Sequence, residues 1–156
     1  MVRFEQVSSQ TASKLLTTAR ALGSAEARGA RAQPLRGKNL ALLAQGPGPS
    51  AELFVAAVEQ LGAKASKIGA DVLAFDDEHE LQRMARVLDR LYDGVECQGV
   101  PSERVRQLSE LATMPVFDGV ACDSHPTARL ADQLDDCSRA DARRWILQAA
   151  LLQTML

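Results

Sequence analysis

The sequence has few of the residues that build metal sites or disulfide frameworks. Its 156 residues include three cysteines, Cys97, Cys122 and Cys137, and two histidines, His79 and His125. The cysteines form no CxxC pair and their number is odd, so we expect reduced thiols rather than disulfides. A structural zinc ion needs closely spaced pairs of ligands. We therefore expect no metal site.

Long apolar segments and strong net charge are also absent. No stretch approaches the ~18 consecutive apolar residues of a membrane span, and the N-terminal MVRFEQVSSQ lacks the apolar region of a secretory signal. The 18 basic and 20 acidic side chains give a net charge of −2, which argues against a nucleic-acid-binding surface. We therefore expect a cytoplasmic protein that binds neither membranes nor nucleic acids.

Arginine is missing from residues 37–82, although the chain contains 14 arginines. Residues 1–36 carry a net charge of +4, residues 37–82 carry −4 and residues 83–156 carry −2. Uneven charge of this kind is typical of solvated faces. Here the gap also covers GPGPS at 46–50. The length fits one domain and excludes a two-domain enzyme of roughly 300 residues.

Two apolar periodicities alternate along the chain. A spacing of three and four predicts helices at 8–22, 50–61, 78–93, 101–112, 125–134 and 138–156. Short apolar runs predict strands at 39–45, 64–69, 94–100 and 114–121. Small polar residues with Gly and Pro predict a mobile loop over 23–34. The alternation indicates a three-layer α/β fold, in which helices cover both faces of a mainly parallel four-stranded sheet.

The ends of these elements locate helix caps and a ligand site. Ser8 or Ser9 is expected to cap the first helix, and Ser138 or Asp141 the last. Ligands of open α/β sheets bind outside the carboxyl ends of the strands. In this chain, the segments that follow the four strands are 45–50, 69–76, 97–101 and 118–126.

Three segments at these positions resemble one known family. LRGKNLALL (35–43) resembles the opening strand of the carbamoyl-phosphate domain of aspartate and ornithine carbamoyltransferases. RMARVLDRLYDGVECQG (83–99) resembles the following helix and strand of the ornithine branch, and LATMPVFDGVACDSHPTARLADQL (111–134) resembles the next strand, its His-Pro-Thr-Gln loop and helix. The resemblance covers about residues 10–134. It implies a four-stranded α/β sheet, carbamoyl transfer to an amino-acid amine, and no cofactor.

The phosphate-binding motifs that the resemblance implies are altered. The family's Ser-Thr-Arg-Thr-Arg loop follows the first strand, where this chain has GPGPSAE (46–52) and no arginine. Pro47 and Pro49 remove two backbone N–H donors, and Glu52 adds a negative charge. The family's Tyr-Arg-Gly is replaced by Cys97-Gln98-Gly99, and the final Gln of its His-Pro-Thr-Gln loop by Ala128.

Five residues remain candidates for contact with an anionic ligand: Gly48, Ser50, Gln98, His125 and Thr127. His125 is the one catalytic candidate, because His125 and Thr127 could donate hydrogen bonds to a carbonyl group. The alternative, which we favour, is that these two residues only begin a helix, with His125 packed or capping it. GPGPS also has two interpretations, a simple turn between strand and helix or a loop that binds phosphate.

The resemblance also implies a second domain that binds the amino acid, for which this chain has no room. The tail after Leu134 resembles the family's final helix through Arg143 and residues 149–152. An unrelated amphipathic helix is the alternative. We interpret residues 1–156 as a single carbamoyl-phosphate-binding-like domain, with 138–156 a C-terminal helix that packs back on it.

The functional hypothesis is therefore a carbamoyltransferase-like protein of amino-acid metabolism that lacks transferase activity alone and acts as an oligomeric or regulatory subunit. The expected partner is another copy, in a trimer by family resemblance, or a full-length carbamoyltransferase. One alternative is a domain that binds a small anion, phosphate or carbamoyl phosphate. Another is a transferase of altered specificity that uses Cys97, Gln98 and His125 in new roles.

Overall fold

A parallel sheet lies at the centre of the computed structural model, which describes residues 7–74 and 76–156. Its strands are β1 (Asn39–Ala44), β2 (Lys64–Gly69), β3 (Gly94–Cys97) and β4 (Val116–Asp118), in the order β2-β1-β3-β4. All three strand pairs are parallel. The predicted α/β class is confirmed.

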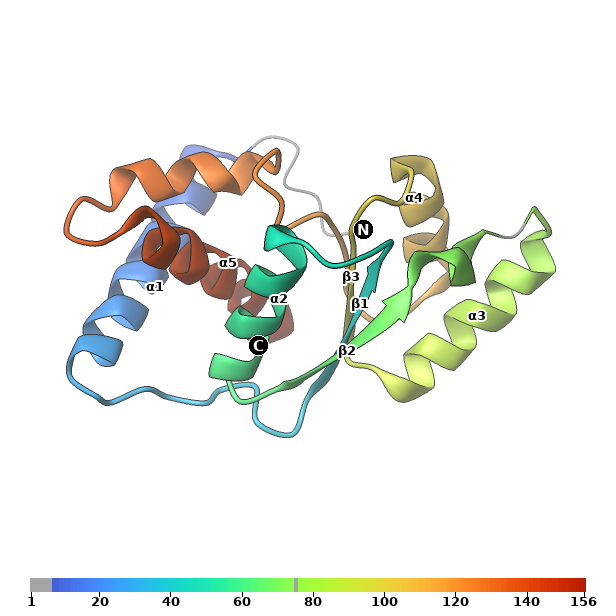
Figure 1. Cartoon of the computed structure of the whole chain (residues 1–156), viewed down its shortest axis with the longest axis horizontal. Coiled ribbons are helices and arrows are strands. Elements are labelled where there is room, and N and C mark those ends of the chain that lie inside the picture. The colour runs from blue at the N-terminus through green and yellow to red at the C-terminus, as the bar shows by residue number, and fades with distance from the viewer. Residues whose placement is uncertain (1–6, 75) are drawn as a thin grey trace.

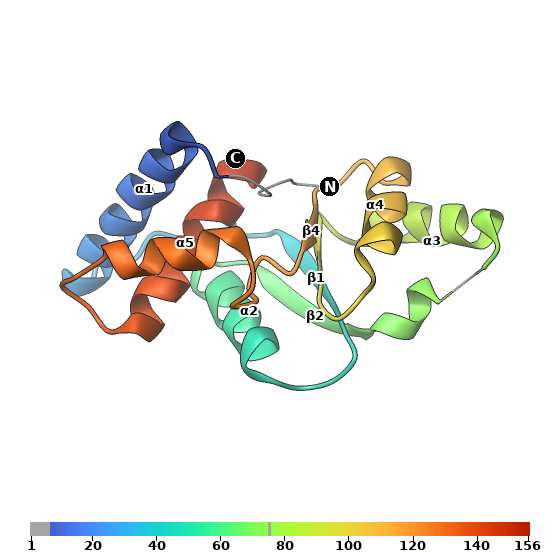
Figure 2. The same ribbon diagram turned by 90° about the horizontal axis from the view of Figure 1, so that it is seen from above.

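Helices cover the two faces of this sheet (Figures 1 and 2). One face carries α1 (Ser9–Ala27), α2 (Pro49–Gln60), the 3-10 helix η2 (Pro126–Gln133) and α5 (Arg139–Met155). The other face carries α3 (Glu78–Leu91) and α4 (Ser102–Leu111), and a short 3-10 helix, η1 (Ala70–Leu73), follows β2. The predicted layering of helices on both sides is therefore present.

Strand β1 is central because its side chains are apolar on both faces. Leu40 and Leu42 belong to the apolar cluster under α1, α2 and α5, whereas Ala41 and Leu43 belong to the cluster under α3 and α4. Burial on both faces is typical of parallel sheets covered by helices. Strand β2, at the edge, is only partly buried.

The register brings the carboxyl ends of all four strands to one edge of the sheet. Ala44 pairs with Gly69, Leu43 with Cys97, and Cys97 with Asp118. The segments that follow the strands therefore start side by side, as required for a ligand site at this edge.

Several predicted boundaries are wrong. The segment 23–27, predicted as part of a mobile loop, continues α1, and the segment 125–134 forms a 3-10 rather than an α-helix. Strands β3 and β4 are shorter than predicted, and α3 ends at Leu91. A side chain at Gly23 would lie 2.9 Å from the Trp145 ring. Gly23, which suggested a loop, is therefore the position where α1 packs closely against Trp145 of α5.

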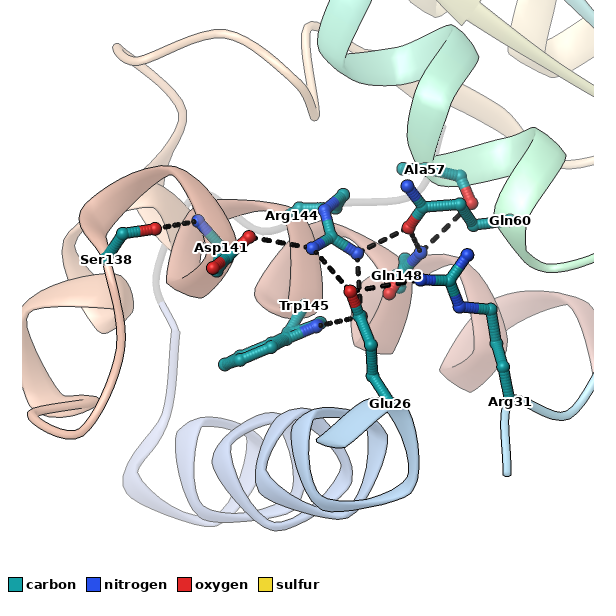
Figure 3. A network of polar contacts seen from close by, with 9 residues as sticks. All are labelled: Glu26, Arg31, Ala57, Gln60, Ser138, Asp141, Arg144, Trp145 and Gln148. Carbon is teal, nitrogen blue, oxygen red and sulfur yellow. Dashed lines mark hydrogen bonds and ion pairs between the residues drawn. The ribbon is translucent and has the colours of Figure 1, made fainter. Parts of the chain in front are cut away.

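A polar network fixes α5 to α1 and α2 (Figure 3). The Arg144 guanidinium donates to both oxygens of Glu26 at 2.9 and 3.1 Å, and also donates to Gln60. The indole N–H of Trp145 donates to Glu26 at 2.9 Å, and Arg31 forms an ion pair with Glu26 at 3.0 Å. Glu26, on α1, therefore holds two consecutive side chains of α5.

Side-chain hydrogen bonds show which residue caps the first helix and which caps the last. The Ser8 hydroxyl oxygen accepts from the Thr11 N–H, and the Ser138 oxygen accepts from the Asp141 N–H. Ser8 and Ser138 are therefore the N-caps of α1 and α5.

Two kinds of feature do not occur among residues 7–74 and 76–156. No helix there has the length and apolar character needed to cross a bilayer. No group of three or more His, Cys, Asp or Glu side chains in the same residues is placed to hold a metal ion.

Candidate functional site

The candidate site lies at the carboxyl ends of β1, β3 and β4, and its first part is the start of α2. Gly48 precedes the helix as its N-cap residue and provides no side-chain cap, and Pro49 occupies the first turn. The first turn also carries Glu52. An uncapped helix N-terminus attracts anions through its free N–H groups and dipole. Here Pro49 lacks an N–H group at the start of the helix, Pro47 lacks one in the loop before it, and Glu52 opposes a negative ligand.

Gln98 joins this turn to the end of β3. Its side-chain amide donates to the Ser50 carbonyl oxygen at 3.1 Å and to a Glu96 carboxylate oxygen at 3.3 Å. Gln98 is 8% exposed. Gly48, Ser50 and Gln98, which the sequence analysis selected separately, thus lie together, but the donor group of Gln98 already has protein acceptors.

Glu96 is a member of the site that the sequence analysis missed. Its side chain is completely buried, and its two oxygens accept from the backbone N–H groups of Val120 and Ala121 at 3.0 and 2.9 Å. Burial raises the Glu96 pKa to about 7, and the hydrogen bonds from these N–H groups limit the shift. An acidic residue inside an apolar strand was the signal that could have identified it.

Arg143 of α5 binds carbonyl groups of the loop whose N–H groups bind Glu96. Its Nη2 donates to the carbonyl oxygens of Val120 and Cys122 at 3.1 and 3.0 Å. The side chain is 5% exposed, and its Nε and Nη1 atoms are buried without a hydrogen-bond partner among the described residues. Burial lowers the pKa of Arg143. The loop after β4 is thus fixed by a carboxylate and by a guanidinium.

His125 and Thr127 form the start of η2. The Nδ1 atom of His125 accepts from the Thr127 N–H at 3.2 Å and lies 2.8 Å from the Thr127 hydroxyl. Burial, together with the positive charge of Arg143, lowers the His125 pKa to about 4. The ring is therefore neutral at pH 7 and carries its proton on Nε2. This geometry agrees with the capping interpretation, and a ligand contact by His125 stays a prediction.

The two cysteines near the site are protonated at neutral pH. Burial raises the pKa of the Cys97 thiol, and the charges of Glu96 and Asp118 raise it further. Burial also raises the pKa of Cys122, and a hydrogen bond with the Ser50 side chain opposes part of that shift. A thiol in the protonated form is a poor nucleophile.

In this arrangement Gln98 joins the start of α2 to the end of β3, and Cys122 joins it to the loop after β4. Comparison with known proteins identifies the family. Residues 1–135 match the carbamoyl-P binding domain of aspartate/ornithine carbamoyltransferase. The chain therefore belongs to the aspartate/ornithine carbamoyltransferase family, as its sequence motifs suggested. Helix α5, which carries Arg143, lies beyond the matched residues.

Individual relatives agree with this assignment. The chain is 36% identical over 119 residues to a catabolic ornithine carbamoyltransferase of Bacillus licheniformis, covering 76% of this chain and 36% of the relative. It is 34% identical over 128 residues to an ornithine carbamoyltransferase of Haemophilus influenzae, covering 81% of this chain and 38% of the relative. The chain thus spans less than half the length of these relatives.

Solved structures show the same fold. Ornithine carbamoyltransferase from Pyrococcus furiosus superposes with a TM-score of 0.67 at 28% identity, over 80% of this chain and 40% of that chain. The enzyme from Burkholderia thailandensis gives a TM-score of 0.69 at 21% identity, over 83% and 45%. The latter supports the fold alone.

Proposed function

We propose that this chain is a carbamoyl-phosphate-domain protein that does not transfer carbamoyl groups alone and acts as an oligomeric or regulatory subunit. The observation that carries this proposal is the start of α2, where a phosphate group would be held. Residues 46–52 contain two prolines and a glutamate but no arginine or lysine. Carbamoyl transfer requires positive charge and N–H donors aimed at the phosphate and the developing oxyanion.

The charge of Glu52 makes phosphate binding at this turn unfavourable. Two like unit charges ~5 Å apart repel by about 3 kcal/mol at an effective dielectric constant of ~20. A bidentate arginine would offset such a cost through two charge-assisted hydrogen bonds. The candidate replacement, Gln98, is neutral and donates to Ser50 and Glu96 instead.

A steady-state assay tests the absence of transfer activity. Carbamoyl phosphate is supplied with ornithine, aspartate or putrescine, and we expect no product above the rate without protein. Turnover that disappears in His125→Ala would refute the proposal and would favour a transferase of altered specificity. Arg129→Gln, which changes an exposed side chain of the same 3-10 helix, is the control for a general effect of substitution in η2.

The proposed subunit role has a separate test. Light scattering measures the mass of the purified chain, alone and after mixing with a full-length ornithine carbamoyltransferase. We expect either a homo-oligomer larger than 16.8 kDa or a stable mixed complex. A strict monomer that does not co-purify with a carbamoyltransferase would count against this role.

A second candidate function, binding of a small anion, is favoured by Arg143. Its guanidinium lies behind the loop that leads to His125, and two of its nitrogens have no partner among the described residues. A rearrangement of that loop would give an anion two unused donors. Phosphate or carbamoyl phosphate at millimolar concentration should then raise the melting temperature, and Arg143→Gln should abolish the shift. No shift in the unmodified protein would exclude this function.

A further inference from the structure

A cavity with a volume of about 370 Å³ lies between α1 and the segment that joins η2 to α5. None of its lining residues belongs to the candidate functional site. Arg20, Gly23 and Ala27 line it from one face of α1, Asp135 and Asp136 line it from the connecting segment, and Trp145 lines it from α5. Cavities of this size accommodate ligands as large as an amino acid.

The Trp145 ring forms a fixed wall of this cavity. Its N–H group donates to Glu26 at 2.9 Å, and Glu26 is itself held by Arg144 and Arg31. Figure 3 shows the ring lying between α1 and α5 with its N–H directed at Glu26. At Gly23 even a single Cβ atom would approach the ring to 2.9 Å. This wall of the cavity is therefore preformed, which reduces the entropy lost when a ligand binds.

Charges of both signs surround the cavity without partners. The side chains of Arg20, Asp135 and Asp136 are exposed, and none forms an ion pair or a hydrogen bond with the residues that the structure describes. By contrast, Glu26 and Arg144 nearby on the same two helices are both paired. The unpaired guanidinium and carboxylates remain available to a ligand that carries the complementary charges.

We propose that this cavity binds a small zwitterion with an ammonium group, a carboxylate and an aliphatic chain between them. Asp135 and Asp136 would accept from the ammonium group, and Arg20 would donate to the carboxylate through two parallel N–H groups. The Trp145 ring, which lines the cavity, would contact the aliphatic chain. Because two carboxylates and one guanidinium line the cavity, ligands with an additional amine should bind more tightly than those with an additional carboxylate.

Tryptophan fluorescence reports directly on this cavity, since Trp145 is the only tryptophan of the chain. The probes are ε-aminocaproate, which carries both charges, and hexylamine and caproate, which carry one each on a chain of the same length. We expect a saturable fluorescence change with ε-aminocaproate at millimolar concentration. Each singly charged probe should bind at least about tenfold more weakly, because one half of the charge complementarity is lost.

Three variants distinguish charge recognition from other effects. Asp136→Asn should weaken ε-aminocaproate and hexylamine, whereas Arg20→Gln should weaken ε-aminocaproate and caproate. Arg28→Gln removes another exposed arginine at the end of α1, outside the cavity, and should change nothing. Melting temperatures should stay close to that of the unmodified protein, because all three side chains are exposed.

The proposal fails if the three probes bind equally, since the cavity would then take only their aliphatic chains. It also fails if Arg28→Gln weakens binding as much as Arg20→Gln, which would indicate general electrostatic attraction. Calorimetry repeats the titration independently of Trp145. If neither method shows saturable binding at millimolar concentration, Arg20 and the two aspartates only solvate the surface and the proposal is wrong.

Discussion

The Glu96 carboxyl group is expected to destabilise the folded protein as the pH rises from acid to neutral. Burial raises its pKa from 4.5 to about 7. The folded pKa exceeds the unfolded one, so this contribution to stability is complete below pH 4.5 and is lost as the pH rises through 7. At about 1.4 kcal/mol for each pKa unit, the loss amounts to roughly 3 kcal/mol.

His125 has the opposite dependence over nearly the same range. Its pKa falls from 6.5 to about 4 through burial and the nearby charge of Arg143. Its stabilising contribution is therefore present above pH 6.5 and is lost as the pH falls through 4. The pH profile of the unmodified protein contains both effects, so only a variant that removes one of them isolates Glu96.

Glu96→Gln provides this separation. The variant cannot ionise, and its amide oxygen can accept from only one of the two backbone N–H groups that face Glu96. The other N–H group then lacks a partner, which costs about 1–3 kcal/mol at any pH. The stability advantage of the unmodified protein over Glu96→Gln should therefore fall by about 3 kcal/mol between acid and neutral pH.

Urea denaturation of both proteins over this pH range measures the difference in unfolding free energy. Glu110→Gln is the matched control, because it makes the same change in charge on an exposed position of α4, where Glu110 pairs with Arg106 at 3.1 Å. Its effect should be small, on the order of a few tenths of a kcal/mol. A difference for Glu96→Gln that is constant, or that increases with pH, would refute the reasoning.

Three further substitutions test the framework, each by urea denaturation at neutral pH. Glu26→Gln weakens the charge-assisted bonds to Arg144 and should cost about 2 kcal/mol; a loss no larger than that of an exposed ion pair would show that the network is solvated. Gly62→Ala should cost at least about 1 kcal/mol, because φ is +92° and a Cβ atom would lie 2.7 Å from that of Gln33; an unchanged or higher stability would contradict this. Ser138→Ala removes the N-cap of α5 and should cost about 1 kcal/mol; no loss would mean that water replaces the cap.

The sheet and its helices were predictable from local patterns. After Asn39, residues 40–44 of β1 are all apolar, so both faces of the strand are apolar, which is the pattern of a central strand covered on both sides. The end of α1 was not predictable in this way, because Gly23 looks like a helix breaker unless its contact with Trp145 is known. A packing contact across more than a hundred residues leaves no periodic signal near the glycine.

The candidate site was only partly predictable for a related reason. Glycine, serine and glutamine near the strand ends, and His125 with Thr127, stood out through their position or motif. Glu96 did not, and Arg143 stood out only in the resemblance of the tail, because both side chains hold backbone groups of residues 120–122. Every residue type offers a backbone carbonyl group, and every type except proline an N–H group. The sequence of the bound loop therefore does not indicate which side chains bind its backbone.

The contacts that shape the site are separate from those that would bind a phosphate. Glu96 and Arg143 fix the loop after β4 through its N–H and carbonyl groups, and these bonds require no ligand. Loss of positive charge from residues 46–52 therefore leaves the bonds of Glu96 and Arg143 unchanged, whereas Ser50 itself contacts Cys122 of that loop. Gln98 fits the same pattern, since its amide links Ser50 to Glu96 in place of contacting an anion. The fold can thus persist while transfer chemistry is lost, which supports the role proposed for this chain.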